Sequence, residues 1–319
     1  MNQSRHKPSG SLFVSVGIPA HNEEKDIINC LESVENQREL GRIVIEEIIT
    51  VTDGCDDKTV ELATDYAIRH PQVRVISHKD RTGKAVAINT IIREARNDIV
   101  ILLNADTILD KQCLASLIKP LNDPRYAIVG SHPVCANPTK GFANYFSHLT
   151  WRLHHQIALK KPKMSSCIAF RRSCFDQIPT DTPVDDVTME AVVMSLGYDI
   201  AYASNAISYI KGPTTLKDHL TQRRRIHAGY CWAKKHHPEY KTPTFAKQKL
   251  AKLIVQEGLS DFKHIPYLIF AVLLEAYSTL QGIYDYYISR YDYQKWPIAT
   301  TTKGIEQTDR LHAEPNQHP

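Results

Sequence analysis

The chain has 319 residues, an ordinary globular composition and a net charge of +4. This composition excludes a fibrous protein, and so small a charge gives no indication of a nucleic-acid partner. Its seven cysteines, an odd number with no Cys-x-x-Cys pair, favour free thiols in a reducing compartment. The polar residues 1–10 predict a disordered leader rather than a secretory signal, so we expect a cytoplasmic location.

Strands and helices are predicted to alternate along the first third of the chain. Each predicted strand is a short apolar run, and each predicted helix has apolar residues at helical spacing. The strands are expected at 12–18, 43–51, 73–77 and 99–103, and the helices at 26–34, 59–70 and 85–96. This alternation predicts an α/β fold with a parallel sheet and helices on both faces.

The apolar run Ile99–Leu103 has no polar interruption, which is typical of a central strand buried on both faces. Asn104 and Asp106 follow it directly. Open α/β sheets bind ligands at the carboxyl ends of their strands, and oxygen ligands of this kind suit a divalent cation with nucleotide phosphates. Asn and Asp also simply end strands and form turns, so this segment alone leaves both interpretations open.

Further polar residues follow the other predicted strands. Asn22 and Glu23 lie between the first strand and its helix, and Asp53 follows the second strand. Gly83 and Lys84 open the third helix, where anions are favoured, although the sequence is not a Walker P-loop. Helix capping also explains Asn22 and Glu23. Because all these groups would meet at one sheet edge, together they predict a ligand site there.

The middle of the chain continues with helices and strands. Helices are expected at 109–121, 144–159, 183–196 and 216–230, and strands at 127–133, 165–171, 200–202 and 207–209. Asp185 and Asp186 at a helix start are either first-turn acids or a candidate general base. Gln222 and Arg225 share one helix face, where a guanidinium can bind a diphosphate, while a basic surface helix is the alternative.

Residues 246–290 are predicted to form a helical extension. An apolar, aromatic stripe covers 265–288 but is interrupted at Glu275, and we expect it to be too short to span a bilayer. It suits a membrane-interfacial helix, a homo-oligomer contact or a core helix. Residues 211–252 carry many lysines and arginines, which suggests anionic phosphates, a membrane surface or a solvated face. We expect a disordered tail over 291–319.

Taken together and in order, these segments resemble the family 2 inverting glycosyltransferases of GT-A fold. The matching segments are Val14–Glu23, Thr52–Thr59, Gly83–Asn89, Asn104–Asp106, Asp185–Asp186 and Gln222–Arg225. The resemblance covers roughly residues 12–230. It implies a GT-A domain over 11–245, with a mostly parallel nucleotide-binding sheet flanked by helices, followed by the C-terminal helical extension.

The resemblance also implies roles for individual residues. Asp106 would bind Mn²⁺ or Mg²⁺, Asp186 would deprotonate the acceptor hydroxyl, and Arg225 would neutralise the leaving diphosphate. Asp185 would lie on the acceptor side. The donor would be a nucleotide-sugar, and a UDP-sugar is the prior expectation. The residues that would bind it are Pro19, Ala20, Asn22, Glu23, Asp53, Lys84, Asn104, Ala105, Asp106, Gln222 and Arg224.

Two departures from the family pattern shape the expected activity. Asn104 replaces the first Asp of the DxD motif, and Ile226 replaces the Trp of the Gln-x-x-Arg-Trp motif of processive synthases. The uncharged Asn104 is expected to weaken metal binding. The loss of the Trp, together with the lack of the transmembrane helices of processive synthases, predicts that one sugar is added to a hydroxyl of a glycan or lipid-linked acceptor. We expect the enzyme to be cytoplasmic or peripheral on the membrane. This activity would belong to polysaccharide or glycoconjugate synthesis.

Two alternatives to this activity stay open. The first is a nucleotide-sugar-binding scaffold subunit of weakened activity, which Asn104 motivates. The second is a sugar nucleotidyltransferase, although the segment Pro19–Asn22 is not the Gly-rich loop expected of that class.

Overall fold

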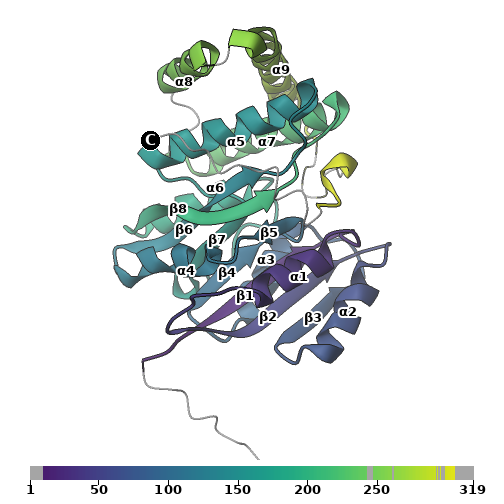
Figure 1. The fold of residues 1–319 in the computed structure, drawn as a ribbon, viewed down its shortest axis with the longest axis vertical. Helices are drawn as coiled ribbons and strands as arrows, with labels where there is room; N and C mark the ends of the chain where they lie inside the picture. The colour runs from purple at the N-terminus through teal and green to yellow at the C-terminus, as the bar shows by residue number, and fades with distance from the viewer. Residues whose placement is uncertain are drawn as a thin grey trace, which may run out of the picture.

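The computed structural model describes residues 10–242, 247–260, 262–291, 293, 295 and 299–305. Within these residues one eight-stranded sheet forms the centre, with strand order β3-β2-β1-β4-β7-β6-β8-β5 (Figure 1). The strands are β1 (Leu12–Ala20), β2 (Ile43–Asp53), β3 (Val73–His78), β4 (Ile99–Leu103), β5 (Thr107–Leu109), β6 (Tyr126–Cys135), β7 (Cys167–Arg171) and β8 (Asp199–Ile210). Strands β1 to β4 run parallel, and β7 is antiparallel to both β4 and β6.

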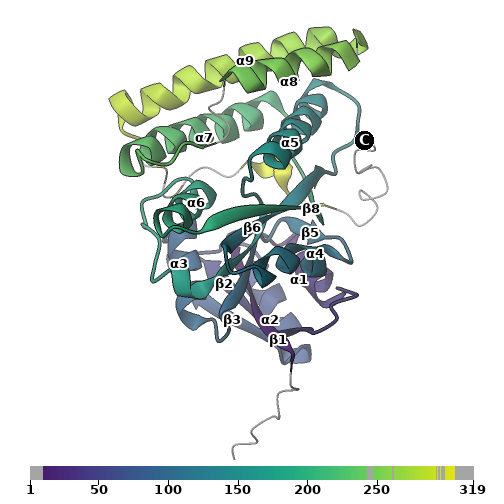
Figure 2. The ribbon, with the colours of Figure 1, turned by 90° about the vertical axis from the view of Figure 1, so that its left-hand side faces the viewer.

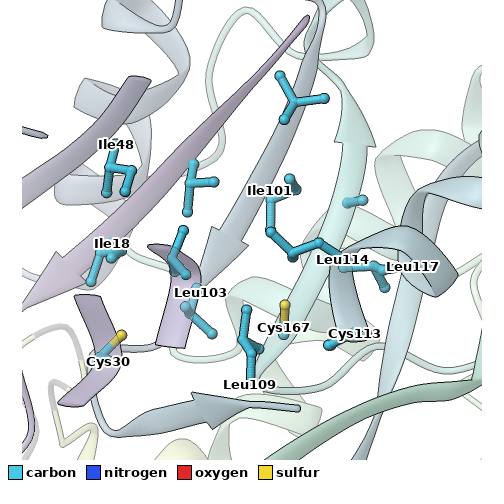
Figure 3. Packing of buried hydrophobic residues seen from close by; sticks show 14 of the residues in the cluster. Ile18, Cys30, Ile48, Ile101, Leu103, Leu109, Cys113, Leu114, Leu117 and Cys167 are labelled. Carbon is cyan, nitrogen blue, oxygen red and sulfur yellow. The ribbon is translucent and has the colours of Figure 1, made fainter. Parts of the chain in front are cut away.

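Helices cover both faces of the sheet. On one face lie α1 (Ile27–Glu35), α2 (Thr59–Arg69) and α4 (Cys113–Ile118), and on the other α3 (Lys84–Glu94) and α6 (Asp185–Ser195). Figure 3 shows the first of these cores, where Ile18 of β1 lies near Cys30 of α1 and Ile101 of β4 lies beside Leu114 of α4. All residues of β4 are buried, as its unbroken apolar run predicted.

A layer of helices stands at one end of the sheet (Figures 1 and 2). It consists of α5 (Phe142–Lys160), α7 (Leu216–His236), α8 (Lys247–Ser260) and α9 (Ile265–Tyr284), which continues as a π-helical turn over Asp285–Ser289. Helices α7 and α9 pack so closely at Gly282 that a Cβ there would lie only 2.7 Å from the Arg224 carbonyl oxygen. Short 3₁₀ turns occupy Lys119–Asn122, Arg172–Cys174, Phe262–His264 and Thr300–Thr302.

Ion pairs also join α7 to α9. Arg223 makes two hydrogen bonds to the Glu275 carboxylate, and His227 Nε2 lies 3.0 Å from the same group. Arg224 binds both oxygens of Asp285, whose side chain is fully buried. Glu275, which interrupts the apolar stripe in the sequence, is therefore paired with Arg223 and His227 of α7.

Two predicted elements differ in the structure. Thr107–Leu109 forms strand β5, so the helix expected from residue 109 begins only at Cys113. Pairing of β5 with β8, from Thr107 opposite Ile210, decides this, because the partner strand is remote in sequence. Likewise, the two late strands expected at 200–202 and 207–209 are one continuous strand, β8, paired along β6.

The C-terminal expectations also change. The helical run Phe262–Ser289 is long and apolar enough, by length and composition alone, to cross a membrane, so the expectation that it is too short was wrong. Of its most apolar window, 28% is buried inside the described part of the protein. The described residues 299–305 of the tail are packed against the domain rather than disordered. Residues 1–9 of the predicted leader and 306–319 of the tail lie outside the described residues.

Candidate active site

A cavity of about 390 Å³ lies at the carboxyl ends of β1, β2 and β4. The three strands end at a similar level, since Ala20 is paired with Thr52 and Gly17 with Leu102. The polar residues that follow these strands are therefore gathered at one edge of the sheet. The predicted site residues that line this cavity are Pro19, Ala20, Glu23, Asp53, Lys84, Asn104, Ala105, Asp106, Gln222, Arg224 and Arg225.

A second cavity, of about 440 Å³, adjoins the first. It extends from Asp185 and Asp186, at the start of α6, towards apolar residues of α5, α8 and α9. The two cavities meet because both are lined by the same residues of the sheet edge and of α7. These shared residues are Lys84, Asn104, Asp106, Gln222, Arg225 and Thr302.

Asp53 is a hydrogen-bond centre at the end of β2. Its carboxylate accepts bonds from Thr82 N (2.9 Å), Thr82 Oγ1 (2.5 Å) and Gly83 N (2.7 Å), and His78 Nδ1 lies 3.2 Å away. Gly54 permits this approach, because a Cβ there would lie 2.2 Å from Arg81 N. Burial would raise the pKa of Asp53, but the bonds from Thr82 and Gly83 outweigh it and lower that pKa. Asp53 therefore holds the 78–83 loop beside the cavity.

Glu23 is buried at the cavity, with only 8% of the residue exposed. Burial, followed by the neighbouring charge of Asp106, raises the pKa of Glu23 to about 8. Its carboxylate accepts a bond from Lys303, whose Nζ also lies 3.8 Å from Asp106 Oδ2. The sequence indicated Glu23 and Asp106 but not Lys303, because a lysine in a polar tail carries no signal of a site.

Asp185 and Asp186 differ in their surroundings although they are adjacent in sequence. Asp185 pairs with Lys84 Nζ at 2.8 Å, which joins α6 to the start of α3. Burial, and then the neighbouring charge of Asp185, raises the pKa of Asp186. Asp186 lines the second cavity.

Helix α7 brings basic residues to the junction of the cavities. Burial lowers the pKa of the Arg225 guanidinium, and the nearby carboxylates of Asp185 and Asp186 oppose that shift. A guanidinium stays charged at neutral pH in either case. Arg224 also lines the first cavity, but both its terminal bonds go to Asp285 on the α9 side. Arg225 lines both cavities, whereas Arg224 lines only the first.

Asn22 lies outside both cavities. Its Oδ1 accepts a bond from Asp56 N at 3.0 Å, and its side-chain amide donates to the Asp56 carboxylate. Its backbone adopts a φ of +55°, a left-handed conformation that Asn tolerates. Asn22 therefore joins the loops after β1 and β2 and does not reach the predicted donor site.

The protein ligands available at Asp106 suit a cation that would also be bound by the phosphates of a substrate. Among the described residues there is no group of three or more His, Cys, Asp and Glu side chains that could enclose a metal ion. The Asp106 side chain keeps 31% of its surface exposed to the cavity. Mg²⁺ often binds through one or two carboxylates together with substrate phosphates, so a single carboxylate fits this mode.

Two family models match the chain. The model described as glycosyl transferase family 2 matches residues 15–178, and that of glycosyl transferase family group 2 matches residues 99–288. The chain belongs to glycosyl transferase family 2. This assignment gives no support to the nucleotidyltransferase alternative, and it confirms the resemblance on which the expected GT-A fold was based.

Curated relatives match parts of this family 2 chain. A dolichyl-phosphate beta-glucosyltransferase, ALG5C, of Trichomonas vaginalis is 30% identical over 99 residues, which is 30% of this chain and 29% of the relative. The O-antigen chain rhamnosyltransferase RfbN of Salmonella typhimurium is 26% identical over 211 residues, 61% of this chain and 65% of RfbN. The chain thus covers less than two thirds of each of these relatives.

A solved structure of similar fold is the mannosyltransferase PcManGT from Pyrobaculum calidifontis, in complex with GDP-Man and Mn²⁺. It superposes with a TM-score of 0.66 at 19% identity, covering 89% of this chain and 90% of PcManGT. At this identity the likeness establishes the fold of the family 2 chain.

The cavity also contains residues that sequence reasoning missed. His21 and Arg81 line it from the loops that follow β1 and β3, and Tyr291 and Tyr293 line it from the segment after α9. His21 was within a quoted motif, so its position in the loop after β1 was an available signal. The two tyrosines and Lys303 reach the cavity only because the C-terminal chain returns across the domain.

Proposed function

We propose that this family 2 glycosyltransferase transfers one sugar from a nucleotide-sugar donor to a hydroxyl of a lipid-linked acceptor, with inversion and with help from a divalent cation. The observation that carries the proposal is the junction of the two cavities. The donor would occupy the cavity at the strand ends, the acceptor would enter the other, and both would reach Asp106, Gln222 and Arg225.

The chain's own groups account for the chemistry of a direct displacement. Asp186 would take the proton from the attacking hydroxyl, and the elevated pKa produced by burial strengthens it as a base once ionised. Arg225 would bind the diphosphate as negative charge grows on it. A cation bound at Asp106 would add Lewis-acid stabilisation of the same leaving group, as the Mn²⁺ in the PcManGT complex suggests.

The lining of the second cavity supports a lipid-linked acceptor. Beyond Asp186 the cavity continues between α5, α7, α8 and α9, where most side chains are apolar. Such a surface favours an apolar chain, because burying it removes that chain from water. The apolar lining residues include Leu149, Leu153, Ile157, Leu250, Ile254, Leu268, Ala271 and Val272. The dolichyl-phosphate relative gives independent support for an acceptor of this chemistry.

The outer surfaces of α8 and α9 support peripheral attachment to the cytoplasmic face of a membrane. Leu259, Ile269, Leu273 and Leu280 are each exposed over more than half of their surface. The exposed Lys263 adds a cation beside them, as anionic lipids would favour. A contact between copies of the chain through 265–288 is the alternative use of this surface.

The donor nucleotide and the transfer reaction can be tested together. A thermal-shift panel of UDP- and GDP-sugars with and without Mn²⁺ identifies the donor, which then enters a transfer assay with a polyprenyl-phosphate acceptor. We expect Asp186→Asn to reduce turnover by about 10²–10⁴-fold while donor affinity is retained. Asp106→Ala should weaken donor binding mainly in the presence of Mn²⁺.

The outcomes separate the two remaining hypotheses. Donor binding without transfer to any acceptor by the wild-type chain would favour the scaffold subunit that Asn104 motivates. Equal turnover of Asp186→Asn and wild type would remove Asp186 from the mechanism. The exposed residue Asp80, changed to Asn, serves as a control that should leave both measurements unchanged.

A further inference from the structure

Residues 299–305, which we call the C-terminal strap, return from the helical layer to the sheet edge. In Figures 1 and 2 this segment is the short yellow turn between the helical layer and the sheet. Ala299, Thr302 and Lys303 of the strap line the first cavity. A segment remote from the sheet-edge motifs in sequence therefore forms part of the wall of the proposed donor site.

Buried carboxylates bind the strap at both ends. Asp26, of which 1% is exposed, accepts bonds from Gly304 N (2.9 Å) and Ile305 N (2.8 Å). Asp218, of which 8% is exposed, accepts from Thr301 N (2.9 Å) and Thr301 Oγ1 (2.6 Å). Since backbone and side-chain donors are both engaged, these bonds fix the position of the residues between them.

Lys303 lies between those two attachments and points into the acidic part of the cavity. Its side chain is only 14% exposed, and its ammonium donates to the Glu23 carboxylate. The same nitrogen is 3.8 Å from Asp106 Oδ2, too far for a hydrogen bond but close enough for a strong charge interaction. A buried lysine is thus directed at the carboxylate where the donor's diphosphate is expected.

Two of the other cations that line the first cavity are paired with carboxylates that do not line it. Lys84 pairs with Asp185 at 2.8 Å, and Arg224 binds Asp285 through both terminal nitrogens. A nucleoside diphosphate brings several negative charges next to Asp106, so it requires compensating cations there. Lys303 is suitably placed, and its flexible stem would let the ammonium move from Glu23 to a phosphate oxygen.

Glu23 supplies an independent sign that the cavity is built for a ligand. Its Oε2 is buried and has no hydrogen-bond partner among the residues that the structure describes. A buried oxygen without a partner is unfavourable, because it has lost its bonds to water. A hydrogen-bonding group of a bound nucleotide would satisfy this atom while the ammonium of Lys303 turns to the phosphates.

Lys303 could instead compete with the divalent cation for Asp106. The exposure of the two groups argues against this, since the Asp106 side chain remains 31% exposed while that of Lys303 is 14% exposed. A divalent cation contacts carboxylate oxygen at about 2.0–2.6 Å, and the longer separation of Lys303 leaves that position open.

We propose that Lys303 is a donor-binding residue that contacts the diphosphate of the nucleotide-sugar. This inference rests on the proposed function, because it assumes that the first cavity is the donor site. It adds the C-terminal strap to that site and makes the strap a requirement for tight donor binding.

The test compares binding of nucleoside diphosphates with binding of nucleosides. UDP, GDP, uridine and guanosine are titrated into the full chain with Mn²⁺ and followed by calorimetry. We expect Lys303→Met to weaken the preferred diphosphate by about tenfold to hundredfold and the nucleoside by less than about twofold. Lys303→Arg, which keeps the charge, should recover part of the diphosphate affinity.

Two further variants make the result specific. Lys295→Met removes an exposed lysine of the same tail and should leave all affinities unchanged. Ile305→Asp places a charge at a buried strap residue, of which 1% is exposed, and should reproduce the loss of diphosphate affinity by releasing the strap. The second variant tests the strap even if Lys303→Met fails to fold.

Three results would overturn the inference. Unchanged diphosphate affinity of Lys303→Met would exclude a phosphate contact, and equal loss of diphosphate and nucleoside affinity would indicate a merely structural role. Tighter Mn²⁺ binding with faster transfer would identify Lys303 as an inhibitory competitor. If the wild-type chain binds no nucleoside diphosphate at all, the proposed function itself fails, and that result differs from a defect confined to the variant.

Discussion

Replacing Asp53 gives the sharpest test of how the candidate site is built. The Asp53 carboxylate accepts bonds from Thr82 N and Gly83 N, in addition to the Thr82 hydroxyl. Asp53→Ala would leave two backbone N–H groups without their acceptor. At about 1–3 kcal/mol for each, the free energy of unfolding should fall by about 2–6 kcal/mol. Asp53→Asn keeps one acceptor oxygen and should lose less.

The pH dependence of this effect follows from the lowered pKa of Asp53. A carboxyl whose pKa is lower in the folded than in the unfolded state stabilises the fold above its unfolded value, about 3.9. That contribution disappears as the pH falls through the folded value. The stability difference between wild type and Asp53→Asn should therefore be full at pH 6 and shrink below about pH 4.

Urea titrations at pH 3 to 7 measure these differences through the midpoint at constant slope. The control is Asp80→Ala, which removes an exposed carboxylate from the same loop and should change the midpoint very little. The reasoning would be refuted if Asp53→Ala and Asp80→Ala had equal midpoints. It would also be refuted if the difference between wild type and Asp53→Asn grew as the pH was lowered.

Two further predictions concern the helical layer. Arg224→Met removes the bidentate partner of the buried Asp285 and should lower the free energy of unfolding by about 1.5–3 kcal/mol. Lys217→Met, at an exposed site of the same helix, should leave the free energy of unfolding unchanged. Equal urea midpoints of the two variants would contradict this prediction. The double change of Leu273 and Leu280 to Ser should weaken binding to phosphatidylglycerol vesicles several-fold without changing the urea midpoint, while Ile68→Ser on α2 should have no effect. A change in oligomeric mass instead of vesicle binding would show that the surface joins copies of the chain.

Local pattern was sufficient for the part of the site that lies on the sheet. An unbroken apolar run can be stable only where both faces are covered, so Ile99–Leu103 specified a central strand. Parallel strands bring their carboxyl ends to one edge, so the groups after β1, β2 and β4 had to gather there. Glu23, Asp53 and Asp106 were predictable for this reason, and the structure brings all three to one cavity.

Two predicted donor-binding residues, Asn22 and Arg224, are instead bound by hydrogen-bond partners that are remote in sequence. Asn22 belongs to a matching motif, yet its amide is bound by Asp56 across two loops. Arg224 lies in a matching motif as well, but Asp285 binds its guanidinium. Residue type and spacing cannot distinguish a side chain directed at a ligand from one that is already paired within the protein.

The sequence by itself determined the α/β sheet, the edge that carries the site and most of the residues gathered there, because these depend on the periodicity of neighbouring residues. Only the tertiary structure decided that the tail forms part of the site. Its composition is that of a disordered segment, and no local pattern stabilises it. The strap is ordered by Asp26 and Asp218 and by burial of Ile305, which are contacts between residues far apart along the chain. Lys303 reaches the first cavity, the proposed donor site, as a consequence of those contacts.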